Sequence, residues 1–489
     1  MPDPQVTHAD LQEMARQIMI EHGFEPEFPA AVRQQVANIQ SQSASAAGST
    51  NGVRDLRGLL WSSIDNDTSR DLDQIEVVEP GANGNVKVMV GIADVDAFVP
   101  RSCPIDDHAA RETTTVYTGV RNFPMLPEEL STGASSLLED QDRRAMVIEF
   151  VAAADGTVSS GTVYPALVRN KAQLTYNAVG SWLGGASPAP PKVAASPDLQ
   201  QQLRLQSQVA QALKKQRFQH GALNIETNEV HPVLLNQQVI DIAKQEKNPA
   251  TDLIEDFMVA ANGVVARLLE KVSSIRRIVR TPEKWDRIVQ LAAQKGGRLP
   301  AQPDSKALND FLLQQKQADP DHFADLSLAV IKLIGPGEYV LERPGDPVQG
   351  HFGLAVQDYT HSTAPNRRFA DVVTQRLLKA LIGGSPPPYS DDELAGIARN
   401  CTDKEDAARK VEREMTKRVA AVMMSSRIGE VFDGFVTGVT PHGTFVRVMN
   451  PHVEGLLAQG AQGVNVGDHF RIRLTRTDVQ RGYIDFARA

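Results

Sequence analysis

The sequence predicts an α+β protein made of three units: a small helical unit at residues 1–50, a large mixed domain at 51–428 and a small β-barrel at 429–489. Three observations carry this prediction. Strand-like apolar runs fill the stretch 74–167, helical periodicity dominates from 199 to 426, and short strands separated by Gly, Asn, Pro and Asp fill the end. Five closely spaced strands in about sixty residues are typical of an OB-fold barrel.

The N-terminal unit is expected to contain short helices. Residues 7–22 place apolar side chains on one helical face, and Gly23 ends the pattern. A second helical stretch follows Pro29, and a Ser/Ala/Gly-rich linker is expected at 41–52. The unit is either a packing appendage or an RNA-contacting variant of the helix-turn-helix, and the sequence leaves both readings open.

The middle of the chain reads as one domain because no convincing linker divides residues 56–428. Strands are expected at 74–78, 86–92, 146–152 and 162–167. Helices are expected at 199–218, 252–272, 285–295, 306–316, 323–334, 369–381 and 392–426.

Composition narrows the class of protein. No apolar run approaches the roughly 20 residues of a membrane span, so we expect no membrane partner. Cys103 and Cys401 are the only cysteines, which argues against a disulfide framework and against a cysteine-based zinc site. We therefore expect a cytoplasmic protein. The net charge of −9 excludes a generally basic nucleic-acid-coating protein, but it leaves room for an enzyme with local basic patches.

Four aspartates lie within nine positions: Asp65, Asp67, Asp71 and Asp73. In extended backbone Asp71 and Asp73 face the same side, and the segment before them reads as a turn. Carboxylates gathered by a turn are suitable ligands for Mg²⁺ or Mn²⁺. The alternative is a solvated acidic turn, and for these residues taken alone it is the stronger reading.

Other segments resemble the catalytic domain of the ribonuclease II family over roughly residues 50–489. The segments that carry the resemblance are, in order, 63–73 (SIDNDTSRDLD), 91–95 (GIADV), 124–127 (PMLP), 254–262 (IEDFMVAAN) and 364–371 (APNRRFAD). The resemblance implies an RNB-type catalytic domain without the family's N-terminal cold-shock barrels. It also implies hydrolysis of RNA from the 3′ end to nucleoside 5′-monophosphates by two-metal chemistry.

By position, Asp65, Asp71 and Asp73 resemble the family's metal- and water-positioning carboxylates, with Mg²⁺ the expected ion and Mn²⁺ the alternative. Many members have a fourth aspartate where this chain has Gln74. Glutamine offers a carbonyl oxygen without the negative charge, so the second metal position is expected to be weakened. Asp67 is a candidate to supply the missing charge.

Two arginines and a glutamate complete the implied catalytic set. Arg367 and Arg368 stand where the family has Ser-Pro-Ile-Arg-Arg-Tyr. Arg367 resembles the arginine on the scissile phosphate, which a planar guanidinium suits well, and Arg368 is expected to contact RNA. The alternative for Arg367 is an ion pair with Asp371. Glu412 resembles a glutamate that approaches the site from a late helix, and its alternative is a solvated helix salt bridge.

Four further residues are implied to contact RNA. Tyr117 resembles an aromatic residue that stacks on the 3′-terminal base, and stacking is indifferent to base identity. Ile225 stands where the family often has an opposing aromatic residue. Tyr176 and Glu255 resemble residues that contact ribose 2′-hydroxyls, and a packing role for Tyr176 is the alternative.

The C-terminal barrel resembles an S1 domain, most closely through residues 442–447 (HGTFVR). We assign Phe432, Phe445 and Arg447 to an RNA-binding surface and Phe435 to the barrel interior. The implied partner is single-stranded RNA. The missing cold-shock barrels predict that RNA with a 3′ overhang and a duplex is also accepted.

A monomer is expected, because threading RNA to one site needs no partner subunit. Three rival functions remain open. The chain is a catalytically impaired RNA-binding regulator of the same family if Gln74 abolishes activity, a scaffold with a binding barrel, or an endonuclease that uses the same metal chemistry.

Overall fold

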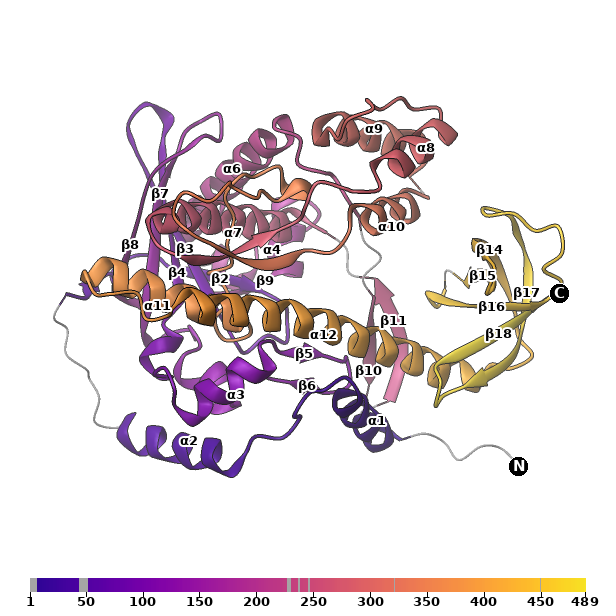
Figure 1. Ribbon diagram of the computed structural model, residues 1–489, viewed down its shortest axis with the longest axis horizontal. Coiled ribbons are helices and arrows are strands. Elements are labelled where there is room, and N and C mark those ends of the chain that lie inside the picture. The colour runs from indigo at the N-terminus through magenta and orange to yellow at the C-terminus, as the bar shows by residue number, and fades with distance from the viewer. Residues whose placement is uncertain are drawn as a thin grey trace.

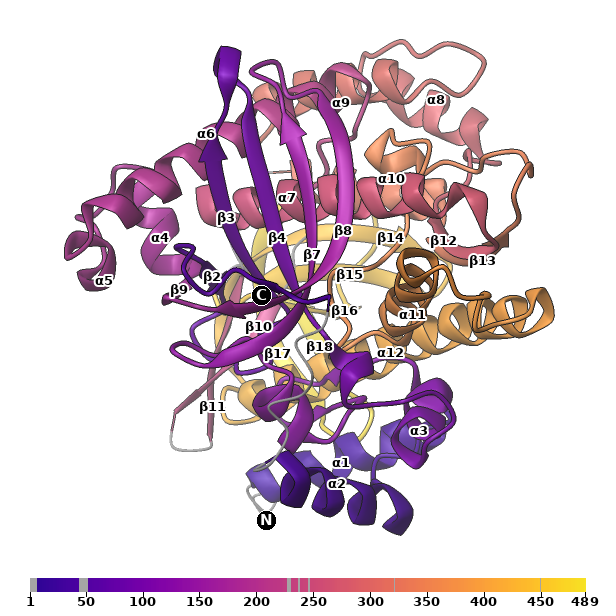
Figure 2. The ribbon, with the colours of Figure 1, turned by 90° about the vertical axis from the view of Figure 1, so that its left-hand side faces the viewer.

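The computed structural model describes residues 7–43, 52–226, 230–235, 238–244, 247–320, 322–448 and 450–489. Of the linker predicted at 41–52, residues 44–51 lie outside the described residues, and 41–43 are helical. The core is a seven-stranded sheet with strand order β1-β8-β7-β4-β3-β2-β9 (Figure 2). Its strands are β1 (Arg54–Asp55), β2 (Ser62–Asp65), β3 (Gln74–Pro80), β4 (Val86–Ala93), β7 (Asp142–Ala152), β8 (Val158–Arg169) and β9 (Ala172–Thr175).

The sheet is antiparallel except where β1 pairs with β8 and β2 pairs with β9. Strand β4 is buried along almost its whole length, which explains its nearly continuous run of apolar residues. Helices α6 (Pro197–Gln219) and α7 (Pro249–Leu268) cross one face of the sheet (Figure 2). Gly161 of β8 lets α7 approach closely, because a Cβ at this position would collide with Val264.

A single long helix, α12 (Asp391–Ser425), runs from the sheet region to the C-terminal barrel (Figure 1). It begins with a capping box in which Ser390 and Glu393 each accept from the other's backbone N–H. Five shorter elements lie on this side of the sheet. They are helices α3 (Pro104–Glu112) and α11 (Phe369–Gly383), the short strands β5 (Val116–Tyr117) and β6 (Asn122–Phe123), and the π-helix η3 (Glu129–Ala134). Of the predicted site residues, Tyr117 lies in β5 and Glu412 in α12, and Arg367 and Arg368 directly precede α11.

The two N-terminal helices pack on different parts of the large domain. Helix α1 (His8–Glu21) lies on α12, and its buried Leu11 and Ile18 join a cluster with Val116 and Phe123 of the β5–β6 hairpin. Helix α2 (Ala30–Ser43) contacts α3. The predicted apolar face of α1 is therefore confirmed, and it packs against the hairpin that carries Tyr117.

The remaining elements form smaller layers around this core (Figure 1). The other helices are α4 (Tyr176–Leu183), α5 (Pro191–Ala194), α8 (Trp285–Gln294), α9 (Ser305–Ala318) and α10 (Phe323–Ile334), with 3₁₀ turns η1 (Ala82–Gly84), η2 (Val95–Ala97), η4 (Leu269–Lys271) and η5 (Phe352–Leu354). Two antiparallel two-stranded sheets are formed by β10 (Val230–Leu235) with β11 (Gln238–Lys244) and by β12 (Ser274–Ile278) with β13 (Glu338–Glu342). Among the helices of the described ranges, none is long and apolar enough to cross a membrane.

The C-terminal unit is a closed five-stranded barrel of order β14-β15-β16-β18-β17, as the sequence predicts. Its strands are β14 (Val431–Thr440), β15 (Gly443–Val448), β16 (Val453–Gln459), β17 (His469–Asp478) and β18 (Tyr483–Arg488).

The predicted sides of two phenylalanines in this barrel are wrong. Phe432 lies in the barrel core, edge-on to Phe486, while Phe435 lies outside that core and stacks on His469. The register of β14 explains the reversal. Phe432 pairs with Ile472, so positions 432, 434 and 436 point inward, and the odd positions between them point outward.

Candidate active site

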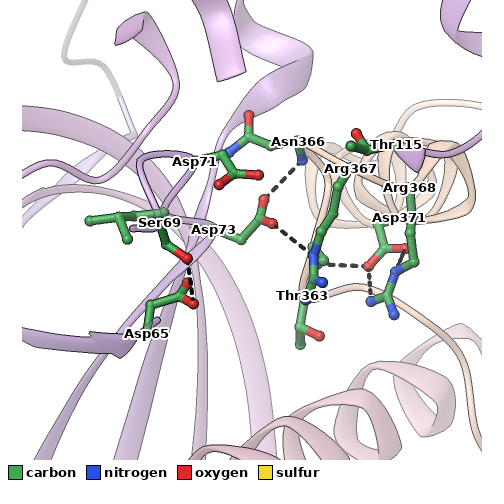
Figure 3. Close-up of polar contacts among 12 residues, drawn as sticks. Asp65, Ser69, Asp71, Asp73, Thr115, Thr363, Asn366, Arg367, Arg368 and Asp371 are labelled. Carbon is green, nitrogen blue, oxygen red and sulfur yellow. Dashed lines mark hydrogen bonds and ion pairs between the residues drawn. The ribbon is translucent and has the colours of Figure 1, made fainter. Parts of the chain in front are cut away.

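The aspartate segment connects two neighbouring strands of the sheet. Asp65 ends β2, and Asp71 and Asp73 immediately precede β3 (Figure 3). The Asp65 carboxylate accepts hydrogen bonds from the Asn66 N–H at 2.7 Å and from the Ser69 hydroxyl at 2.9 Å. These bonds fold the connection back as a turn, so that Asp65 lies on the same side as the two later aspartates.

Asp73 is the most deeply buried of the three aspartates, with 2% of its surface exposed. Burial raises the pKa of its carboxyl to about 7, and the Arg367 cation and the Asn366 N–H act in the opposite direction. Burial also raises the pKa of Asp65, and the nearby Asp71 carboxylate adds to this effect. The negative charges of the aspartates thus repel one another in a poorly solvated region.

An arginine approaches this group from the loop before α11. The Arg367 Nε lies 3.5 Å from Asp73 Oδ2, and the Asn366 N–H donates to Asp73 Oδ1 at 2.9 Å (Figure 3). About half of the Arg367 side chain, 49%, remains exposed. Its guanidinium is therefore oriented by Asp73 and still accessible to an anion. The alternative prediction of an Arg367–Asp371 ion pair is wrong.

Arg368 makes that ion pair instead. Its guanidinium donates to both carboxylate oxygens of Asp371, at 2.7 and 2.8 Å, and Asp371 is fully buried. Asp371 also accepts from the Ala364 N–H at 2.8 Å. Arg368 thus braces the loop that carries Arg367, and its contacts do not support the predicted RNA-binding role.

Tyr117 and Glu412 lie together beside the aspartates. The Tyr117 hydroxyl donates to Asp71 Oδ2 at 3.3 Å, and its backbone N–H donates to Glu412 Oε1 at 3.0 Å. Tyr117 is also one of the exposed large hydrophobic residues of the protein, at 40%. Its ring is anchored at the hydroxyl end and remains free to stack. Glu412, on α12, fixes the backbone of the hairpin that carries the ring.

Three other predicted residues have different surroundings. Tyr176 begins α4 directly after Thr175, the register partner of Asp65, and is half-buried against the core. Glu255 on α7 forms an ion pair with Lys247 at 2.8 Å. Ile225 packs against the apolar cluster of α8, α9 and α10. The structure thus brings Tyr176 close to the aspartates, while the recorded contacts of Glu255 and Ile225 lie elsewhere.

The described contacts of the Gln74 and Asp67 side chains do not join them to the aspartate group. Gln74 is buried as the first residue of β3, and in the described part of the chain no hydrogen bond or ion pair joins it to Asp65, Asp71 or Asp73. Asp67 is exposed and accepts a hydrogen bond from Asn177 of α4. The proposed compensation of Gln74 by Asp67 therefore has no contact to support it.

The chemistry of the aspartate oxygens fits a hard divalent cation, since carboxylates are the preferred ligands of Mg²⁺ and Mn²⁺. Within the described residues, however, no group of three or more His, Cys, Asp or Glu side chains is arranged closely enough to hold an ion. The three aspartates therefore have the right donor atoms, but in these positions they do not form a closed coordination shell.

On the barrel, Phe445 and Arg447 lie on the outer face, as predicted for Phe445. Arg447 is occupied by two carboxylates: Asp325 of α10 at 2.9 Å and Glu454 at 3.0 Å. His322, which precedes α10, lies edge-on to Phe435 at 6.0 Å. This part of the outer face is therefore where the barrel meets the large domain.

Sequence reasoning missed several residues that hold the site. Asn366 donates its N–H to Asp73, Ser136 bonds the backbone of the aspartate segment, and Ser135 contacts the Asn366 side chain. A signal existed for Asn366, because the family motif has isoleucine at this position. No pattern in the sequence marks the two serines.

Comparisons with known proteins match both large units. An RNB domain model matches residues 53–384, and a model of the RNase II-type exonuclease C-terminal S1 domain matches residues 430–489. Ribonuclease R of Escherichia coli K12 is 28% identical over 94% of this chain and 60% of its own length. Ribonuclease R of Vibrio cholerae is 31% identical over 91% of this chain and 55% of its own length. The chain thus spans less than two thirds of these relatives.

Solved structures agree at the level of the fold. Mycoplasma genitalium RNase R in complex with ribose-methylated single-stranded RNA has a TM-score of 0.85 at 23% identity, covering 98% of this chain and 78% of that one. Yeast Ssd1, a pseudonuclease, has a TM-score of 0.68 at 17% identity, covering 88% of this chain and 54% of that one. These likenesses show the fold alone, and a fold does not by itself fix the function.

Proposed function

Because the chain belongs to the RNB domain family, we propose that it degrades RNA from the 3′ end and releases nucleoside 5′-monophosphates. The observation that carries this proposal is the position of Arg367. Its half-exposed guanidinium is oriented by the buried Asp73 and lies on the same side as Asp65 and Asp71. An anion-binding group beside a set of carboxylates is what phosphodiester hydrolysis requires, since charge develops on the phosphate oxygens.

Each residue of the site has a role that follows from its contacts. Arg367 binds the non-bridging oxygens of the scissile phosphate, and Asp73 keeps its guanidinium in place. The exposed ring of Tyr117 stacks on the terminal base without discriminating between bases. Glu412 holds the backbone of Tyr117, so the stacked base is fixed relative to the phosphate.

A divalent cation is part of this proposal. Asp65, Asp71 and Asp73 would hold Mg²⁺ or Mn²⁺, which when bound supplies activation of the attacking water and neutralisation of the leaving 3′ oxygen. Burial and, as a smaller cause, the Asp71 carboxylate raise the pKa of Asp65, and this supports cation binding because a bound cation stabilises the charged form of the carboxyl. Closing the coordination shell requires the carboxylates to move together when the ion and the phosphate arrive.

Several parts of the chain support RNA as the substrate. The barrel matches an S1 domain, and the outer position of Phe445 leaves an aromatic ring for single-strand binding. RNase R of Mycoplasma genitalium has been solved with single-stranded and with double-stranded RNA. We extend both kinds of RNA to this chain as proposed substrates.

Degradation of 5′-labelled single-stranded RNA tests the proposed function. With Mg²⁺ we expect a descending ladder that EDTA abolishes and that Asp73→Asn eliminates. Asp67→Asn is the matched control, because Asp67 is exposed and bonded only to α4 in the described contacts, so this variant should remain active. Internal fragments would instead indicate an endonuclease. RNA binding without any degradation would indicate an impaired regulator, the reading that Gln74 favours.

A further inference from the structure

The candidate site is assembled from two segments that are distant in the sequence. The aspartate segment precedes β3, and the arginine loop precedes α11, with 293 positions between Asp73 and Asn366. Catalysis at a phosphate requires the two to keep a fixed separation, because small displacements of reacting groups are costly. The turn that follows η3, residues 135–137, contacts both segments.

Ser136 holds the aspartate segment. Its hydroxyl accepts a hydrogen bond from the Leu72 N–H at 3.0 Å and donates one to the Arg70 carbonyl at 2.7 Å. The Leu137 N–H donates to the Leu72 carbonyl at 3.0 Å. Three hydrogen bonds therefore fix the backbone on both sides of Asp71, and Ser136 is completely buried.

Ser135 holds the arginine loop. Its oxygen lies 2.6 Å from Asn366 Oδ1 and 2.7 Å from the Leu130 carbonyl oxygen. A serine hydroxyl has one hydrogen, so it cannot donate to both oxygens. The conflict is removed if the Asn366 amide is rotated by half a turn, which exchanges Nδ2 and Oδ1. Its Nδ2 then donates to Ser135, and the Ser135 hydroxyl donates to Leu130.

This rotation also accounts for the Asn366 nitrogen. In the unrotated orientation of the amide, Nδ2 is buried and has no hydrogen-bond partner in the described part of the protein. A buried amide N–H without a partner is unfavourable, whereas the rotated amide places this nitrogen on Ser135. The backbone N–H of the same residue donates to Asp73, and the next residue is Arg367. Asn366 thus connects the serine turn to both charged groups of the site.

We propose that Ser135, Ser136 and Asn366 form a positioning bridge that fixes Asp71 and Asp73 relative to Arg367. The proposal rests on the proposed exonuclease function. It assigns a role to Asn366, which replaces the isoleucine of the family motif, and to its hydroxyl partner. None of the three residues touches the substrate, so they act through the groups that they hold.

A double-mutant cycle tests the bridge. Ser135→Ala leaves the Asn366 amide without its partner, and Asn366→Ile removes the N–H that the Ser135 oxygen accepts. We expect each to lower kcat about tenfold with KM for RNA nearly unchanged, and the double variant to lose about tenfold rather than about a hundredfold. Removing both polar partners together avoids leaving either one buried and unpaired.

Ser131→Ala is the matched control. Ser131 lies one turn earlier in η3, is similarly buried, and bonds only to backbone carbonyls in the described structure. We expect this variant to lose stability without a change in kcat. If Ser135→Ala does not fold, Ser135→Cys, which retains the volume but is a weak hydrogen-bonding group, replaces it in the cycle.

A second readout does not depend on activity. Ser136→Ala frees the backbone around Asp71, so Mg²⁺ should raise the melting temperature of this variant by less than half of the rise seen for wild type and for Ser131→Ala. Wild-type protein that degrades no RNA would overturn the proposed function. Active wild type with additive losses in the cycle, or with Ser135→Ala equal to Ser131→Ala, would overturn the bridge.

Discussion

At the scale of single residues, the site is organised around Asp73. This carboxylate is almost fully buried, accepts the Asn366 N–H and faces Arg367. Burial therefore makes the charged form of Asp73 unfavourable, and Asp73 in turn orients the Arg367 guanidinium that we assign to phosphate binding. Two consequences can be measured without knowing the natural RNA substrate.

The first consequence is a pH dependence of stability in the metal-free protein. Burial raises the pKa of Asp73 to about 7, above the value of about 3.9 expected in the unfolded chain. Between these values the folded state binds the extra proton, so the free energy of unfolding should fall as pH rises from about 4 to about 7 and level off above. Urea unfolding with EDTA measures this slope, and Asp73→Asn should flatten it. An equal slope in both proteins would contradict the assignment.

The second consequence concerns Arg367. Arg367→Lys retains the positive charge but loses the planar pair of donors, so we expect kcat to fall about a hundredfold with a smaller change in KM. Steady-state kinetics on a short oligoribonucleotide measures both constants. Arg280→Lys, at an exposed ion pair with Glu338, is the control that should retain full activity. If kcat of Arg367→Lys stayed within about twofold of wild type, Arg367 would have no role in the mechanism.

Tyr117 offers a test that separates its ring from its hydroxyl. Tyr117→Ala removes base stacking worth about 1–3 kcal/mol, so KM for short RNA should rise about tenfold or more. Tyr117→Phe retains the ring and loses only the 3.3 Å hydrogen bond to Asp71, so its KM should stay close to wild type. The prediction fails if both variants raise KM equally.

At the scale of elements, the site depends on helices that hold its hairpin in place. Helix α12 supplies Glu412 to the Tyr117 backbone, and α1 packs against both α12 and the β5–β6 hairpin. Helix α1 thus supports the hairpin that carries Tyr117. This packing is a consequence of its apolar stripe, which the sequence already shows.

Helix α1 contains its own matched pair of isoleucines. Ile18 is completely buried, whereas Ile20 is 42% exposed. Ile18→Ala should lower the free energy of unfolding by about 2–4 kcal/mol, because it removes buried contacts and leaves a cavity. Ile20→Ala should cost well under 1 kcal/mol. Thermal or urea unfolding of the two variants measures the difference, and equal losses would show that α1 is not packed as described.

At the scale of the whole molecule, the barrel and the large domain meet through charged and aromatic contacts. Arg447 bridges to Asp325 of α10, and His322 lies against Phe435. Helix α12 makes a second contact with the barrel, at strands β17 and β18. The barrel is thus held to the large domain at two places.

This arrangement leads to a test on structured RNA. With double-stranded RNA as a proposed substrate, we expect the protein to digest a duplex that carries a short 3′ overhang through the paired region. Gel analysis of a labelled duplex gives the product lengths, with a blunt duplex and a single strand as controls. Products that end several nucleotides before the duplex would rule out this substrate range.

The sequence by itself determined the local features. Strand runs, helical faces, the α1 stripe and the five short strands of the barrel all follow from periodicity and turn residues, which depend on neighbours in the chain. The order of motifs identified the family, and the model match over residues 53–384 confirms it. The aspartates, Arg367 and Tyr117 were all found at this level.

Only the tertiary structure decided which of these residues meet. It assigned the Asp371 ion pair to Arg368 rather than Arg367, and it moved Phe432 into the barrel core. It also brought Ser135 onto Asn366 across 231 positions of sequence. The physical reason is common to all three. A hydrogen bond or ion pair depends on distances of a few ångströms between atoms, and those distances are set by long-range packing and strand register rather than by neighbouring residues.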